Sequence, residues 1–187
     1  HHQGNHVSIA KFYPEGTIVS SGLSKWCGAG GWRLGTFSFP PGLSWLLEAM
    51  TAVASETFTA VSAPIQYAAI QAFEGSAEIE NYLAHARKIL SALGNKLASI
   101  LRSGNIEVND PSGAFYLFLD FSSVKDSFLK KGIDNSSKLC EVLLADTGVA
   151  ILPGVDFNRP AEELTARLAY VDFDGAKALA ASYAIPL

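Results

Sequence analysis

The stretch GLSKWCGAGGWRLG, residues 22–35, sets the interpretation of the whole chain. It places Lys25 and Arg33 among glycines, small residues and two tryptophans. No aspartate or glutamate occurs between Glu15 and Glu48, so the neighbouring sequence supplies no acid to pair with either cation. The pattern raises the question of which negatively charged group these two side chains meet.

Three interpretations of Lys25 compete. A solvated surface lysine is the simplest, and a phosphate-cradling P-loop is the second. The P-loop fails because Lys25 precedes its glycines, whereas that motif needs the order Gly-x-x-x-x-Gly-Lys-Ser/Thr. The third is a Schiff-base lysine, a type whose amine is generally activated by burial beside another cation. In that case Arg33 would bind a phosphate dianion through its planar, forked donors.

Two strands followed by three helices are expected before residue 104. The first helix is expected to be buried, and Pro64 starts the second. Ser76 caps the third and longest, which ends near Gly104. The expected strands are 16–24 and 32–40, and the helices are 42–58, 63–74 and 76–103.

Strands alternate with shorter helices after Gly104, so a second structural unit is expected there. The turn DPSG separates its first two strands, and Gly148 ends its first helix. The expected strands are 105–110, 113–121, 149–154 and 165–171, and the helices are 136–148 and 174–184.

The composition excludes several classes of protein. The chain has 187 residues, 49% of them hydrophobic, and a net charge of −4. It has no Lys/Arg-rich run and no apolar stretch of about 20 residues, which argues against nucleic acid and membrane partners. Cys27 and Cys140 are expected to be free thiols in a reducing, cytoplasmic compartment. His1 and His2 resemble the end of a purification tag and carry no fold argument.

The opening stretch resembles the pyridoxal-phosphate attachment signature of class I and II aminotransferases. That signature is a small-apolar-small-Lys segment, a glycine-containing spacer and then Arg-apolar-Gly. PSGAFYLFLDF (111–121) resembles the segment that opens the family's small domain, and GVAILPGVDF…ARLAYV (148–171) resembles its C-terminal segment. The three matches occur in the family's order over residues 22–171.

The resemblance implies transamination between an amino acid and a 2-oxo acid by an aspartate aminotransferase-like enzyme with pyridoxal 5'-phosphate. Lys25 would hold the cofactor as a Schiff base and shuttle the substrate proton. Arg33 would bind the cofactor phosphate, and Arg167 would bind the substrate's α-carboxylate. No metal is expected.

One position departs from the family's pattern. Many members carry a phosphate-binding serine three residues before the lysine, and here Gly22 stands in its place. Ser21 or Ser24 would then supply the hydroxyl to the phosphate.

The fold that the resemblance implies is α/β, of fold type I. Residues 1–90 would be the C-terminal part of the cofactor-binding large domain, and residues 91–187 an α+β small domain, joined by the long helix. No counterpart occurs for the family's glycine-rich phosphate loop, its ring-stacking aromatic residue or the aspartate for the pyridinium nitrogen. The chain is therefore expected to be the C-terminal half of a homodimeric aminotransferase, inactive alone, with an exposed apolar surface that favours self-association.

Alternatives remain open at this point. A lyase or synthase on the same scaffold would use the same residues, and a non-catalytic folded module would use none of them. Arg167 lies in an apolar strand, where an unpaired charge costs several kcal/mol, and a salt bridge with Glu162 or Glu163 is the alternative to a substrate carboxylate. Structural roles are expected for the other polar or aromatic candidates, which are Cys27, Tyr116, His6, His85, Asp120 and Asp172.

Overall fold

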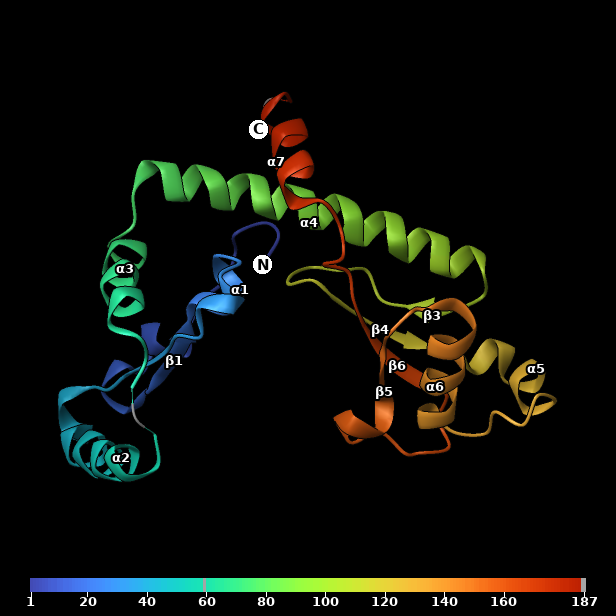
Figure 1. Cartoon of the computed structure of the whole chain (residues 1–187), viewed down its shortest axis with the longest axis horizontal. Helices are drawn as coiled ribbons and strands as arrows, with labels where there is room; N and C mark the ends of the chain where they lie inside the picture. Colours follow the sequence, from blue (N-terminus) through green and yellow to red (C-terminus); the bar gives the residue numbers. More distant parts are fainter. Residues whose placement is uncertain (59, 186–187) are drawn as a thin grey trace. The chain divides into compact units, whose positions relative to one another are not determined.

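The computed structural model describes residues 1–58 and 60–185, which divide into two compact units (Figure 1). We call Gly4–Ala84 the hairpin unit. The sheet unit consists of His1–Gln3 and the described residues from His85 onward. The domain division expected between residues 90 and 91 stays a prediction, because both positions lie inside one continuous helix.

An antiparallel β-hairpin organises the hairpin unit. Strand β1 (Val19–Gly22) pairs with β2 (Gly35–Ser38), and the register places Gly22 opposite Gly35. The loop between the strands begins with α1 (Leu23–Trp26), a single helical turn where the sequence predicted an irregular loop. The backbone therefore leaves β1 and turns at once, which puts Lys25 in this turn at the end of the hairpin.

Helices α2 (Ser44–Thr57) and α3 (Ala63–Glu74) follow the hairpin, as predicted. A small core of Leu23, Leu34 and Ala69 joins α1 and the residue that precedes β2 to α3. The prediction that the first helix is buried is wrong: none of the residues of α2, all of them described, is buried. An apolar composition like that of α2 is typical of a buried helix. Within the described residues of this unit, however, no other element covers α2.

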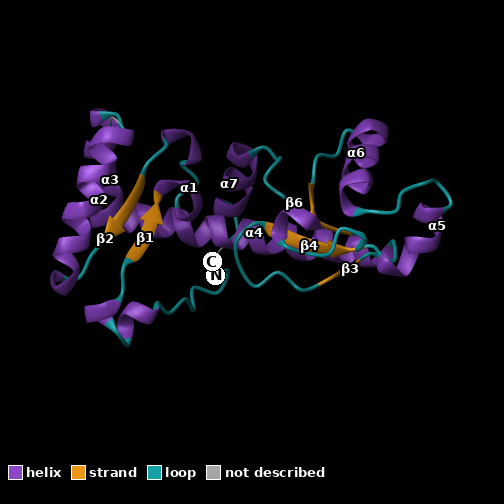
Figure 2. Ribbon diagram, turned by 90° about the horizontal axis from the view of Figure 1, so that it is seen from below, coloured by secondary structure: helices purple, strands orange, loops and turns teal. Residues whose placement is uncertain are grey.

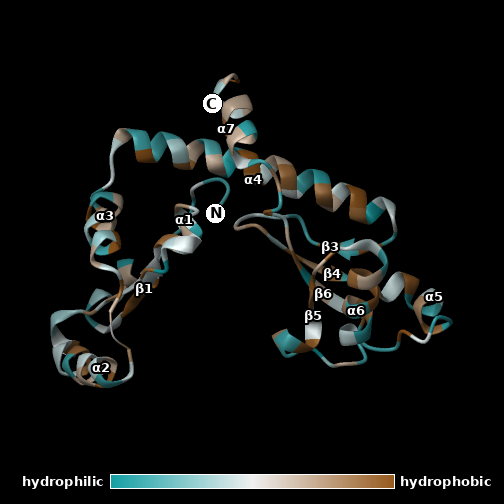
Figure 3. Ribbon diagram, in the orientation of Figure 1, coloured by the Kyte–Doolittle hydropathy of each residue, from teal (hydrophilic) through white to brown (hydrophobic). Residues whose placement is uncertain are grey.

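The long helix α4 (Ala77–Ser103) begins and ends as its sequence predicts. The Ser76 hydroxyl accepts a hydrogen bond of 3.2 Å from the Ile79 amide, which satisfies one of the unpaired donors of the first turn. The amide of Gly104 donates to the carbonyl of Leu101 at the other end. Hydrophobic residues recur every three or four positions along the helix, between hydrophilic ones, which is the pattern that predicted it (Figure 3).

A four-stranded antiparallel sheet in the order β3-β4-β6-β5 organises the sheet unit. Figure 2 labels three of its strands, β3, β4 and β6. The helices α5, α6 and α7 complete the unit, and α5 was not predicted from the sequence. The strands are β3 (Glu107–Val108), β4 (Tyr116–Asp120), β5 (Leu152–Pro153) and β6 (Thr165–Ala169), and the helices are α5 (Lys125–Leu129), α6 (Ser136–Thr147) and α7 (Gly175–Tyr183).

The core of the sheet unit lies on one face of this sheet. Leu117 and Leu119 of β4 are buried against Leu139 of α6 and Ala98 of α4. Because side chains alternate along a strand, Tyr116 and Phe118 point to the opposite face. The same alternation on β6 puts Arg167, which pairs with Phe118, on that opposite face. The sheet therefore separates the apolar core from the candidate substrate arginine.

Both cysteines are free thiols, and Cys140 belongs to the core of the sheet unit. Burial, with the Asp156 carboxylate as a second cause, raises the pKa of the Cys140 thiol to about 11. No helix among residues 1–58 and 60–185 is long and apolar enough to cross a membrane.

Candidate active site

Lys25 and Arg33 line one hollow of about 510 Å³ at the end of the β-hairpin. Lys25 comes from α1, which follows β1, and Arg33 precedes β2. The hairpin thus brings together two cations that are eight positions apart in the sequence. Lys25 is exposed in this chain, so the burial expected for a Schiff-base lysine is not met by the described residues.

Serine hydroxyls complete the lining of this hollow. Ser21 and Ser24, both predicted from the sequence, line it together with Ser20, which the sequence argument missed. The signal for Ser20 was its position in the strand that leads to the lysine. The nine lining residues include no aspartate or glutamate. Ser20 and Ser21 are neighbours on β1, so their side chains point to opposite faces of the hairpin. Cations and serine hydroxyls without an acid form a set of donors suited to a phosphate dianion.

Close packing of the two strands explains the glycine at position 22. A Cβ atom on Gly22 would lie 2.7 Å from the carbonyl oxygen of Leu34 and 3.1 Å from the Cα of Gly35. A serine here would collide with the backbone of Leu34 and Gly35. The hydroxyls at neighbouring positions are therefore the ones that this hairpin can offer to a phosphate.

Replacing Gly22 with alanine should destabilise the hairpin unit by about 1–3 kcal/mol, the usual cost of forcing atoms into a packed site. All three tryptophans of the chain lie in this unit, so urea unfolding followed by tryptophan fluorescence measures its free energy of unfolding. Gly31→Ala is the matched control, because a Cβ there meets nothing within 4 Å. If the two variants have the same free energy of unfolding, the close approach of the backbone at Gly22 does not contribute to stability.

Arg33 has an unusual backbone conformation. Its φ of 55° lies in the left-handed region, which is uncommon for residues other than glycine and carries strain. The Arg33 Nη1 group donates a hydrogen bond of 2.8 Å to the carbonyl of Gly30. The side chain is thus folded back over its own turn and is exposed, and this bond uses one of the five N–H donors of the guanidinium.

Arg167 lies in the sheet unit, at the centre of β6. Glu163, one of its two expected salt-bridge partners, is paired with Arg159 at 2.6 Å. Among the described residues, Arg167 forms no ion pair with Glu162 or with any other acid. Its guanidinium instead lies 4.5 Å from the ring centroid of Tyr116 and 4.3 Å from that of Phe157.

Most of the remaining candidates have local structural partners. His85 is buried and its Nδ1 lies 2.8 Å from the Ser182 hydroxyl. The Cys27 thiol donates to the carbonyl of Leu23 at 3.0 Å. Asp120 accepts hydrogen bonds from the amide and the hydroxyl of Ser122, which makes it a turn residue as expected. His6 and Asp172 are exposed, and no cluster of possible metal ligands occurs among residues 1–58 and 60–185.

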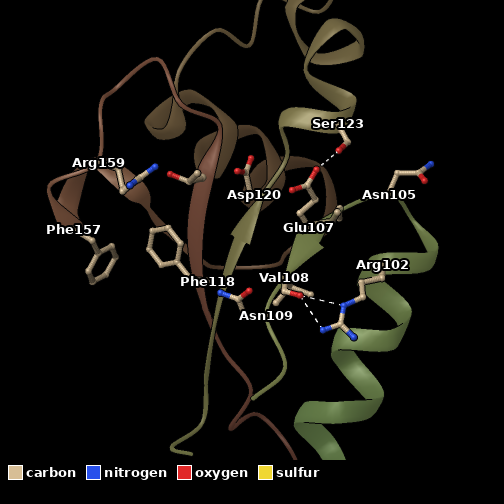
Figure 4. Close-up of a pocket in the computed structure, with 12 residues that line it drawn as sticks. Arg102, Asn105, Glu107, Val108, Asn109, Phe118, Asp120, Ser123, Phe157 and Arg159 are labelled. Carbon is tan, nitrogen blue, oxygen red and sulfur yellow. Dashed lines mark hydrogen bonds between the residues drawn. The ribbon is translucent and has the colours of Figure 1, made fainter. Parts of the chain in front are cut away.

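A second hollow, of about 980 Å³, lies in the sheet unit, and charged side chains of both signs line it (Figure 4). Arg102 donates to the carbonyl of Val108 and pairs with Asp110 at 2.6 Å. Glu107 accepts a hydrogen bond of 2.6 Å from Ser123. Acids line this hollow as well as cations, whereas the residues around the hollow of Lys25 include no acid, so the hollow of Lys25 is the stronger candidate for an anion.

Comparison with known proteins identifies the class of protein to which this chain belongs. The family model "Aminotransferase class I and II" matches residues 3–178. The chain belongs to this family and is homologous to aminotransferases that depend on pyridoxal phosphate. The prediction of the family from the sequence is therefore confirmed.

Individual relatives agree with the family model. An aspartate aminotransferase of Bacillus sp. (strain YM-2) is 32% identical over 169 residues, which is 88% of this chain and 40% of the relative. An asparagine–oxo-acid transaminase of Streptococcus mutans is 32% identical over 145 residues, which is 77% of this chain and 35% of the relative. This chain thus spans about 40% or less of the length of these curated relatives.

Solved structures show the same relation. The structure of an aspartate aminotransferase from Thermus thermophilus with maleate is 26% identical, with a TM-score of 0.75, over 96% of this chain and 42% of that one. An aromatic aminotransferase from Pyrococcus horikoshii OT3 is 29% identical, with a TM-score of 0.74, over 95% of this chain and 44% of that one. The mixed α/β structure therefore matches part of the aminotransferase fold.

Proposed function

We propose that this chain is the lysine-bearing part of an enzyme that transfers an amino group from an amino acid to a 2-oxo acid. The observation that carries the proposal is the shared hollow, in which Lys25 and Arg33 are accompanied by three serines and no acid. The relatives named above are transaminases by description, which favours transamination over a lyase or synthase reaction.

The donor set fits pyridoxal 5'-phosphate. Arg33, with Ser24 and one of the two neighbours Ser20 and Ser21, would hold the phosphate through charge-assisted hydrogen bonds. Lys25 would hold the cofactor covalently through Nζ. When bound, the cofactor supplies an electron-withdrawing ring that makes the substrate's Cα–H bond acidic.

Two steps belong to this chain's own side chains. The Lys25 amine would act as the acid–base group, accepting the proton from the substrate's α-carbon and giving it up again later in the reaction. Arg167 binds the α-carboxylate and so fixes the orientation of the Cα–H bond. Each of the two arginines would thus bind its own anion: Arg33 the phosphate and Arg167 the carboxylate.

The reaction class is tested by acceptor dependence. In a protein that joins this sequence to the remainder of an aminotransferase chain, product should form only when both an amino acid and a 2-oxo acid are supplied. Consumption of the amino acid without a 2-oxo acid would instead support a lyase or synthase on the same scaffold.

We propose further that the 187-residue chain alone lacks this activity, because other parts of the family's fold complete the cofactor site. An absorbance scan of the purified chain with added pyridoxal phosphate tests whether it still holds the cofactor. A visible band that Lys25→Ala removes would show retained binding at this site. A chain without such a band would be a non-catalytic folded module.

Substituting Arg33 with lysine should weaken cofactor binding by about 1–3 kcal/mol, the scale of hydrogen bonds to a charged group. The change keeps the positive charge but removes the planar fork that matches two phosphate oxygens. The dissociation constant of the cofactor in an active protein carrying this sequence measures the effect. An unchanged constant would refute the phosphate role of Arg33.

We also propose that this chain forms homodimers, and its exposed apolar side chains support self-association. Trp45 of α2 is 63% exposed and Tyr67 of α3 is 73% exposed. Gel filtration at increasing concentration should therefore show species larger than a monomer, and Trp45→Lys should reduce them. Leu129→Lys, at an exposed leucine of the sheet unit, is the control. Strictly monomeric elution at high concentration would count against the proposal.

A further inference from the structure

The guanidinium of Arg167 lies between two aromatic rings. Its Cζ atom is 4.5 Å from the ring centroid of Tyr116 and 4.3 Å from that of Phe157. Tyr116 belongs to β4, the neighbouring strand, whereas Phe157 ends a separate turn of 3-10 helix, Gly154–Phe157. Two different elements therefore place a ring against the same cation. We call this pair of rings the aromatic clamp.

The clamp leaves the N–H donors of the Arg167 guanidinium available, whereas a salt bridge would use them. An aromatic face attracts a cation through the quadrupole of the ring and needs none of its N–H groups. A carboxylate partner, in contrast, would occupy the two parallel donors of the guanidinium. Because Arg167 forms no ion pair among the described residues, the fork that a carboxylate requires is not consumed by an internal acid.

A third ring supports the clamp from the sheet. Phe118 lies directly opposite Arg167 in the register of β4 and β6. Its ring meets that of Phe157 edge-to-face, with centroids 6.0 Å apart and an interplanar angle of 88°. Figure 4 shows the two rings side by side at the rim of the larger hollow. Edge-to-face pairs of this kind are favourable beyond their burial, so Phe157 is held in place by the sheet itself.

We propose that Phe157, together with Tyr116, is a positioning residue that holds the guanidinium of Arg167 ready for a substrate carboxylate. The inference rests on the proposed function of Arg167 and extends it to residues that would not touch the substrate. The clamp replaces the missing counter-ion: it stabilises the cation in the absence of substrate and leaves its donors available.

The test uses the whole 187-residue chain, labelled with ¹⁵N, and follows the Nε–Hε signal of Arg167 by NMR. Arg167→Lys assigns the signal by removing it. The two rings should shift this signal by their ring currents, and Phe157→Leu should remove a large part of that shift while Phe157→Tyr restores it. Phe173→Leu is the matched control, since Phe173 is not one of the two rings stacked on Arg167.

The same samples are then titrated with maleate, and a titration with sodium chloride at equal ionic strength is the control. We expect the Arg167 signal to respond to maleate, with a dissociation constant about two- to five-fold weaker in Phe157→Leu, the scale of one cation–π contact. Phe157→Tyr and Phe173→Leu should bind as the unsubstituted chain does. Tyr116→Leu, which removes the other ring, provides the same comparison if Phe157→Leu does not fold.

The possible outcomes distinguish the role of the aromatic clamp from the carboxylate-binding role of Arg167. Unchanged maleate affinity in the leucine variants, with a responding Arg167 signal, would overturn the clamp and leave the carboxylate role of Arg167 intact. An Arg167 signal that ignores maleate in the unsubstituted chain would overturn the carboxylate role, and the inference with it. Weakened binding in the leucine variants and recovery in Phe157→Tyr would support both.

Discussion

Replacing Lys25 with alanine should abolish transamination in an active aminotransferase that carries this sequence. Alanine can neither hold the cofactor covalently nor carry the proton from the substrate's α-carbon. A positioned acid–base group alone typically contributes about 10²- to 10⁴-fold to a rate, so the loss in kcat should be at least this large. Steady-state kinetics with an amino acid and a 2-oxo acid measure it, while the cofactor should still bind weakly and reversibly.

Lys11→Ala serves as the control for this substitution. Lys11 is also exposed and also belongs to the hairpin unit, but it does not line the hollow of Lys25. The control should keep its normal turnover. Near-normal turnover in Lys25→Ala as well would end the assignment of Lys25 as the catalytic lysine.

Arg167→Ala should raise the KM for amino acids by about 10- to 100-fold, because a hydrogen-bonded charge pair with the α-carboxylate is lost. Amines that lack the carboxylate should be affected much less, since they have no such contact to lose. Cofactor affinity should hardly change, because the phosphate is assigned to Arg33. Kinetics with the two substrate classes, at a temperature well below unfolding, separate these effects.

A purely structural Arg167 predicts another pattern, with lower thermal stability and equal losses for both substrate classes. Arg159→Ala is the matched control in the same unit, since Arg159 is paired with Glu163 at 2.6 Å. It should leave the difference between the substrate classes unchanged. Equal losses in Arg167→Ala would require the carboxylate site to be sought elsewhere.

Local signals were sufficient to predict the long helix. The cap at Ser76, the apolar repeat of three or four residues and the glycine at 104 each have a counterpart in α4. The turn at α1 was missed because a single helical turn gives no periodicity, and α5 was missed for the same reason.

Burial was harder to predict than secondary structure. The sequence of α2 is apolar and was expected to be buried, but burial depends on what else is present to pack against it. The described residues of the hairpin unit provide only a small core around Leu23, Leu34 and Ala69. The composition of a helix can thus predict burial even where the chain has no residues to cover it. This chain matches only 40% of the length of its relative.

The candidate site was predictable where the sequence carried a motif. Lys25, Arg33, Ser21 and Ser24 come from one continuous stretch, and the structure brings them to one hollow. The aromatic clamp of Arg167 was not predictable, because Tyr116 and Phe157 are 41 positions apart and meet only through the fold. The steric reason for Gly22 likewise depends on the partner strand, which the order of residues does not reveal.

Borohydride reduction tests the central claim most directly. A protein that contains this sequence and is loaded with pyridoxal phosphate is reduced, digested and mapped by mass spectrometry. The account predicts that the cofactor mass is fixed on the peptide that carries Lys25, and that Lys25→Ala removes this label. A cofactor label on any other lysine, with Lys25 unmodified, would contradict it.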